Sequence, residues 1–232
     1  MVRATEQIDL NNSDAGQTLK SGLSGIDSAL EGGYSKGDVV AVQFPAESSG
    51  VELAYALATE PTHPTMYLTT LRPETLVETE IRSERQRGLG TEQAEFAVRY
   101  AEDGDLGEFS STYGTSALGA SFVVDTFLDY AEDDDDWRTA LTDIVSTARQ
   151  TSSVVYLLLH PPEWDTQLPI VQKTNHVADV VMEYQIGESQ QGHDILNILK
   201  ARRCNITESL PLRLELDVNQ NGIGVSTKRS FK

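Results

Sequence analysis

Residues 44–51 occupy the position at which a nucleotide-binding α/β protein places its phosphate loop. The apolar run 39–44 predicts a buried strand, and the apolar residues between positions 53 and 57 predict a helix directly after it. A turn of small residues between a strand and a helix aims backbone N–H groups and the helix N-terminus at a phosphate. The turn therefore provides the candidate nucleotide-binding residues Glu47, Ser48, Ser49, Gly50 and Val51.

The side chains that phosphate chemistry requires are missing from this turn. A phosphate loop has the pattern Gly-x-x-x-x-Gly-Lys-Ser/Thr, in which the lysine contacts the β- and γ-phosphates and the hydroxyl binds magnesium. The chain has Phe-Pro-Ala-Glu-Ser-Ser-Gly-Val, so Gly50 stands in the lysine position. Glu47 and Glu52 add negative charge beside a negative ligand. The turn predicts weak or no binding of ATP and magnesium.

Two further candidates follow buried strands. Asp125 ends the apolar run at 121–124, and His160 ends the run at 154–159. Ligands of parallel α/β sheets lie at the carboxyl ends of the strands, so both side chains are expected at the same edge as Ser48. Each has an ordinary alternative: Asp125 caps the next turn or contacts the serines, and His160 is a hydrogen-bonded histidine without a function.

The acidic run from Asp133 to Asp136 allows two interpretations. Four converging carboxylates would bind a metal ion, whereas consecutive carboxylates at a helix start diverge and stabilise its positive end. Trp137, Leu141 and Ile144 follow at helical spacing, which favours the helix start. We predict no catalytic residue and no metal ligand in the chain. Cys204 is the only cysteine, which excludes a disulfide framework.

The charge balance is strongly acidic. The 232 residues include 36 acidic and 18 basic side chains, a net charge of −18. This charge disfavours nucleic acid as the main partner, because phosphate backbones are bound by clustered Lys and Arg. Dispersed acidic residues with little lysine are typical of halophilic proteins, although an ordinary acidic protein is the alternative. Without a secretory signal or a membrane-spanning apolar run, we expect a cytoplasmic protein.

Strand and helix patterns alternate along the chain and predict one α/β domain over residues 18–232, after a loose polar arm at 1–17. A short helix ends at Gly32-Gly33, and a charged helix covers 73–87. Residues 104–119 are expected to form a loop. Helices are expected over 137–148 and 166–177, the second interrupted or started late by Pro169. Strands are expected over 65–70, 95–100, 179–185, 194–200, 210–218 and 223–225.

The segment before the first buried strand resembles a known family. Residues 21–40 follow the pattern Ser-Gly-Leu-Ser-Gly-Ile-Asp-x-x-Leu-x-Gly-Gly-x-x-x-Gly-Asp-Val-Val. This pattern is similar to the lead-in of the phosphate loop in KaiC-like and RadA-like ATPases of the RecA superfamily. The resemblance implies a RecA-like P-loop fold, with a mainly parallel twisted sheet, helices on both faces and antiparallel C-terminal strands.

The resemblance also assigns expected roles to single residues. Asp125 corresponds to the acid on the magnesium side of the family's site, and His160 stands near its polar sensor. The family's catalytic glutamates at the end of the preceding strand are replaced by Leu71 and Arg72. Lys200 and Arg202 match a Lys-x-Arg segment that reaches the neighbouring subunit's nucleotide in KaiC-like hexamers; a basic strand end in an acidic protein is the alternative.

These features predict a non-catalytic or weakly active KaiC-like protein, a regulatory, signalling or assembly module with protein partners. Its oligomer would contain its own copies or an active KaiC-like paralogue, whose site Lys200 and Arg202 would complete. One rival is a genuine ATPase that recruits Lys36 or Lys20 into the site. Another is a recombination-mediator paralogue that binds DNA through a basic stripe. That stripe would consist of Arg82, Arg85 and Arg87.

Overall fold

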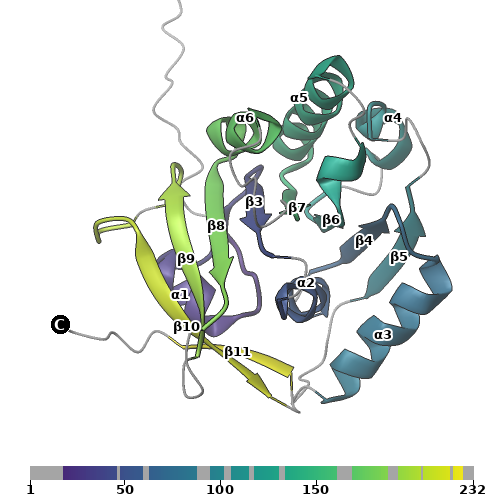
Figure 1. Cartoon of the computed structure of the whole chain (residues 1–232). Coiled ribbons are helices and arrows are strands. Elements are labelled where there is room, and N and C mark those ends of the chain that lie inside the picture. The colour runs from purple at the N-terminus through teal and green to yellow at the C-terminus, as the bar shows by residue number, and fades with distance from the viewer. Residues whose placement is uncertain are drawn as a thin grey trace, which may run out of the picture.

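One large mixed sheet runs through the protein (Figure 1). In this computed structural model, the described residues are 18–45, 48–59, 63–87, 95–101, 106–114, 118–130, 134–160, 169–187, 193–204, 206–219 and 222–226. Within them, the strand order is β11-β10-β9-β8-β3-β7-β6-β4-β5. The six strands from β8 to β5 in this order are parallel, and β9, β10 and β11 extend the sheet antiparallel. The predicted fold class is confirmed.

The strands follow the apolar runs of the sequence. The parallel strands are β3 (Val39–Gln43), β4 (Thr65–Thr69), β5 (Phe96–Tyr100), β6 (Ser121–Val124), β7 (Val154–Leu159) and β8 (Val180–Gln185). The antiparallel strands are β9 (Asp194–Ala201), β10 (Leu212–Asn219) and β11 (Gly222–Ser226). A separate small ribbon pairs β1 (Thr18–Leu19) with β2 (Tyr34–Ser35).

Helices cover both faces of the sheet (Figure 1). One layer contains α1 (Ser24–Ala29), α2 (Gly50–Thr59) and α3 (Glu74–Arg87). The other contains α4 (Phe109–Tyr113), α5 (Asp134–Thr151) and α6 (Pro169–Val177), and a short 3₁₀ turn, Phe127–Tyr130, follows β6. The acidic run therefore starts a helix, as its interpretation predicted, although Asp133 lies outside the described residues.

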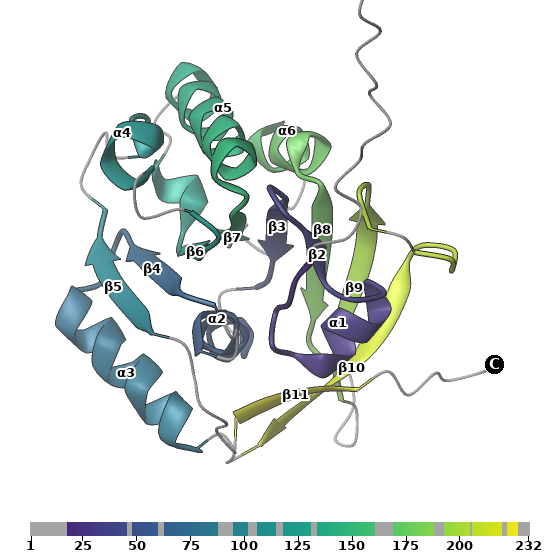
Figure 2. The ribbon, with the colours of Figure 1, turned by 180° about the vertical axis from the view of Figure 1, so that it is seen from behind.

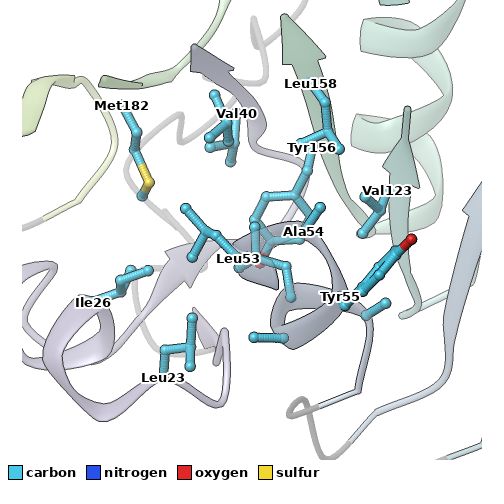
Figure 3. Close-up of a cluster of buried hydrophobic side chains, with 14 of the residues drawn as sticks. Leu23, Ile26, Val40, Leu53, Ala54, Tyr55, Val123, Tyr156, Leu158 and Met182 are labelled. Atoms are coloured by element: carbon cyan, nitrogen blue, oxygen red, sulfur yellow. The ribbon is translucent and has the colours of Figure 1, made fainter. Parts of the chain in front are cut away.

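Alternate residues of each parallel strand enter different cores. In β3, Val40 and Val42 pack beneath α1 and α2, whereas Val39 and Ala41 pack beneath α5 and α6. This alternation is the two-residue period of a strand that is covered on both faces. Figure 3 shows the first core, in which Leu53 of α2 lies close to Tyr156 of β7. Both cores hold the strand ends of the parallel sheet in place.

The C-terminal hairpin closes over the first helix layer. Figure 2 shows β10 and β11 running alongside α1 and α2, at the lower side of the view. The contact with α1 is close, because a Cβ at Gly25 would lie 2.4 Å from the carbonyl oxygen of Val225. Only glycine permits this approach. Helix α1 ends at Ala29, before the predicted glycine stop at Gly32 and Gly33. Glu31, at φ 53°, is the left-handed residue of the cap, and the Gly32 N–H donates to the Asp27 carbonyl over 2.8 Å.

One further predicted boundary differs from the structure. Residues 104–119 were expected to be a loop, but Phe109–Tyr113 form α4, whose Phe109 and Tyr113 are both buried. Helix α6 begins at Pro169, in agreement with the late start expected there, because proline is favourable in the first turn of a helix; residues 166–168 lie outside the described residues. The predicted arm at 1–17 also lies outside them. None of the described helices combines the length and the apolar character needed to cross a membrane.

Candidate functional site

The carboxyl ends of four parallel strands bring the candidate residues to one edge of the sheet. Phe44 follows β3, Arg72 lies just beyond β4, Asp125 follows β6 and His160 follows β7. The parallel pairing of these strands places their ends side by side, as expected for a ligand site in an α/β sheet. The predicted meeting of Asp125 and His160 is present in the structure.

The turn after β3 is hydrogen-bonded internally. The Ser48 hydroxyl donates to the carbonyl of Pro45 over 2.6 Å and accepts from the Gly50 N–H over 3.2 Å. The Leu53 N–H donates to the Ser49 carbonyl over 3.3 Å, which continues the first turn of α2. Val51 packs against the core, and Glu47 lies outside the described residues. The Ser48 hydroxyl is thus used to cap the start of α2.

The Phe44 ring fills the space in front of this helix. Phe44 is only 2% exposed, and its Cδ2 atom lies 2.1 Å from the position that a Cβ would take at Gly50. The ring also packs edge-on against His160, with 4.1 Å between ring centroids and an interplanar angle of 73°. Phe44 occupies the first glycine position of the phosphate-loop pattern, and Gly50 the lysine position. Compared with the phosphate-loop pattern, a large side chain stands where glycine is expected and a glycine stands where lysine is expected.

Asp125 is contacted by two basic side chains, Arg72 and His160. Its carboxylate is 9% exposed, lies 3.2 Å from an Arg72 guanidinium nitrogen, and lies 3.5 Å from Nε2 of His160. The distance to His160 is at the outer limit of a hydrogen bond. His160 therefore acts on Asp125 mainly through its charge, when it is protonated, and not through a directed hydrogen bond. Arg72 is the firmer of the two partners.

The guanidinium of Arg72 also contacts both neighbouring helices. Its other terminal nitrogen donates to the Tyr55 hydroxyl of α2 over 2.8 Å and to the Glu80 carboxylate of α3 over 2.9 Å. Tyr55 itself donates to Glu80. In Figure 3 the Tyr55 hydroxyl points away from the apolar cluster, which leaves it available for these contacts. A single side chain therefore links α2, α3 and the end of β6.

The electrostatics of the edge favour an ionised Asp125. Burial opposes its charge, but the adjacent His160 imidazole and the nearby Arg72 guanidinium outweigh burial and hold the pKa of this carboxyl below its ordinary value. Burial, together with the hydrogen bond to Glu80, raises the pKa of the Tyr55 phenol, which therefore stays protonated and able to donate. The positive charge of Arg72 is balanced by the carboxylates of Asp125 and Glu80.

The residues of an ATP–magnesium site do not fit this arrangement. Phe44 and Gly50 leave neither the lysine nor the open cradle that a phosphate group needs, and Arg72 occupies the carboxylate that would face magnesium. In the described part of the chain, no group of three or more His, Cys, Asp or Glu residues is placed to hold a metal ion.

Lys200 and Arg202 lie at the other edge of the sheet. Ala201, between them, pairs with Val180, which starts β8 and lies beside the start of β3. The Lys200 ammonium donates to three carbonyls at the end of α6, among them that of His176 over 2.9 Å. Arg202 is exposed. The contacts of Lys200 show a structural role within its own chain, and a role in a neighbouring subunit stays a prediction.

The lysines of the rival ATPase reading are also remote. Lys36 precedes β3 and therefore lies at the opposite end of that strand from Ser48, and Lys20 adjoins Gly33 in the same lead-in segment. Of the predicted basic stripe, Arg82 pairs with Glu78 over 2.5 Å. The side chains of Arg85 and Arg87 lie outside the described residues.

Sequence reasoning did not identify the side chains that close the site: Phe44, Tyr55, Arg72 and Glu80. A signal for the first of them was present, because a bulky aromatic at a glycine position and a glycine at a lysine position are complementary in volume. Arg72 carried a weaker signal, a positive charge where a catalytic acid is expected. Its partner Asp125 is 53 residues away, and only the fold brings the two together.

The fold is shared with a solved KaiC-like protein from the hyperthermophilic archaeon Pyrococcus horikoshii OT3. The two structures superpose with a TM-score of 0.65 at 16% sequence identity, over 90% of this chain and 98% of the other. This likeness establishes the fold that the two proteins share and nothing about activity. A search of curated proteins gave no match. The model of a family of unknown function, DUF7125, matches residues 18–231, and the chain therefore belongs to that family.

Proposed function

We propose that the protein is a non-catalytic KaiC-like module that acts through protein partners, in regulation, signalling or assembly. The observation that carries the proposal is the contact between Phe44 and Gly50, which fills the phosphate cradle with an aromatic ring. Phosphoryl transfer depends on positive charge placed around the phosphate, and this cradle provides a ring in its place. A concentrated-salt cytoplasm is the setting that the acidic composition predicts.

Exposed apolar residues beside the closed site support a role in protein contacts. Leu71 is 64% exposed directly next to Arg72, and Leu76 and Tyr100 are each exposed by nearly half. The Tyr100 N–H donates to the Glu74 carboxylate over 2.7 Å, so the end of β5 and the start of α3 are joined at this point. Mixed apolar and arginine surfaces are typical of protein interfaces. A partner could be another copy of the chain or an active paralogue.

The proposal is tested by rebuilding the cradle. The variant Phe44→Gly, Glu47→Gly, Ser49→Gly, Gly50→Lys and Val51→Thr restores the phosphate-loop pattern. We expect it to bind ATP at least roughly tenfold more tightly than the unaltered chain, which corresponds to 1.4 kcal/mol. Isothermal titration in molar salt measures the change.

The matched control keeps Phe44 and carries the other four substitutions. Because the ring overlaps the Cβ position at residue 50, this control is expected to show no gain in ATP affinity, and a lysine there has to displace the ring. Circular dichroism shows whether each variant is folded. Equal gains with and without the ring would remove Phe44 as the reason for the closed cradle. Tight MgATP binding by the unaltered chain would contradict the proposal itself.

A further inference from the structure

We propose that Arg72 is a built-in cation that holds the strand ends and helices of the site together in place of a bound nucleotide and metal. The inference builds on the proposed function, since it assigns the closed site its own internal counter-ion. The residues at this edge do not fit the nucleotide and magnesium that the fold implies.

The buried carboxylate of Asp125 requires a positive partner. With the side chain 9% exposed, an unpaired charge here would lose most of its hydration, which is costly in a protein interior. Arg72 supplies the charge at 3.2 Å from inside the chain. The end of β6 is therefore satisfied without any external cation.

The same guanidinium fixes the surrounding elements. It reaches Tyr55 at 2.8 Å and Glu80 at 2.9 Å, and its central carbon lies 5.7 Å from the Tyr55 ring centroid. A planar guanidinium with several donors is suited to such a junction, whereas a lysine ammonium is a single point of charge. Arg72 therefore connects α2, α3, β4 and β6 at once.

Two threonines complete the connection between strand ends. Thr70, two residues before Arg72, donates to the backbone carbonyl of Asp125 over 3.2 Å and hydrogen-bonds to the Thr126 hydroxyl. The segment that carries Arg72 is thereby fixed to the segment that carries its partner. Leu71 lies between Thr70 and Arg72 in this segment and is exposed.

The experiment is a double-variant cycle on the full chain in molar salt, with melting temperature as the readout. Arg72→Gln is expected to lower the melting temperature by roughly 4–10 °C, because it leaves Asp125 buried without its main partner. The matched control Arg82→Gln removes an arginine that pairs with Glu78 on the surface of α3, and it should shift the value by no more than about 2 °C.

The double variant Arg72→Gln/Asp125→Asn is expected to recover at least about half of the loss, because it removes the unpaired charge together with its partner. Additive losses, or equal effects of Arg72→Gln and Arg82→Gln, would overturn the inference. Urea unfolding gives the same comparison if heating is irreversible. A parallel scan of the unaltered chain with millimolar MgATP separates the two proposals: stabilisation by MgATP contradicts the closed site, and leaves the coupling of Arg72 to Asp125 to be decided by the cycle.

Discussion

At the scale of single residues, the contact between Phe44 and Gly50 makes an unusual prediction. Helix propensity alone favours Gly50→Ala in α2 by up to about 1 kcal/mol. The new methyl group would lie 2.1 Å from the Phe44 ring, so we expect destabilisation of about 1–3 kcal/mol, as for other overpacked sites. Urea unfolding of the unaltered chain and of Gly50→Ala measures this difference.

The same substitution has the opposite expectation once the ring is gone. Phe44→Ala should cost about 3–5 kcal/mol, as a buried phenylalanine does when it is truncated. In that background, Gly50→Ala fills part of the vacated space and should be neutral or stabilising. A Gly50→Ala effect that is the same in both backgrounds would show that the ring and the glycine are not coupled.

Asp38 provides a prediction about pH. Asp38 directly precedes β3 and is fully buried. Burial raises the pKa of its carboxyl to about 7, although the nearby Arg203 opposes the rise. Because the folded-state pKa lies above the ordinary value of 3.8, its contribution to stability is present below about pH 4 and lost as the pH rises to about 7. Asp38→Asn removes this loss. Relative to the unaltered chain, the variant should therefore gain on the order of 2 kcal/mol between about pH 5 and 8.

Urea unfolding across this pH range, at constant high salt, checks the gain. Asp217→Asn, at an exposed position of β10, is the control and should follow the unaltered chain at every pH. A constant difference between Asp38→Asn and the unaltered chain from pH 5 to 8 would contradict the expected titration.

At the scale of elements, α6 depends on a strand residue for its C-terminal cap. Lys200 of β9 donates to the carbonyls of Asn175, His176 and Ala178, where the helix dipole is negative. Lys200→Met keeps the aliphatic stem and removes the charge, and it should cost about 1–2 kcal/mol with faster amide exchange in α6. The neighbouring exposed Arg202→Met should change stability by less than about 0.5 kcal/mol.

The outcome also bears on the predicted role in a neighbouring subunit. Equal and negligible effects of the two substitutions on the isolated chain would show that the cap is unimportant to stability. Such a result would show that Lys200 does not stabilise its own chain, and it would favour the predicted role of Lys200 and Arg202 at a neighbouring subunit's nucleotide. A marked effect of Lys200 alone fits the cap.

The elements were largely predictable because burial on both faces of a parallel sheet produces continuous apolar runs. The runs at 39–44 and 154–160 became β3 and β7 with little change in their bounds. Helix α4 was not predicted, since five residues are too few for a helical period to stand out. Its sign was the pair Phe109 and Tyr113, four positions apart and both buried.

The candidate site was only half predictable. Asp125 and His160 were expected at one edge because each follows a buried apolar run, and the parallel pairing of β6 and β7 places them there. Which side chain neutralises Asp125 depends on the distance between two strand ends and on a rotamer of Arg72, neither of which the sequence pattern contains. The loss of a motif is visible in the sequence, whereas the side chain that takes over its charge is identified only in the folded structure.

At the scale of the whole molecule, the net charge of −18 predicts a dependence on salt. At 0.01 M salt the Debye length is about 30 Å, so charges across the molecule repel one another, whereas molar salt screens them within about 3 Å. We expect the melting temperature to fall by several degrees as salt is lowered from molar to millimolar concentration. A melting temperature that is unchanged over this range would refute the halophilic interpretation.

The side chain of Phe44 fills the phosphate cradle of this chain. Isothermal titration of the unaltered protein with ATP in molar salt, with and without magnesium, tests this most directly. With Phe44 against Gly50 and Arg72 on Asp125, we predict no binding heat up to millimolar ATP under either condition. A saturable isotherm with micromolar affinity would show that the cradle opens to nucleotide, and would contradict a cradle closed by Phe44.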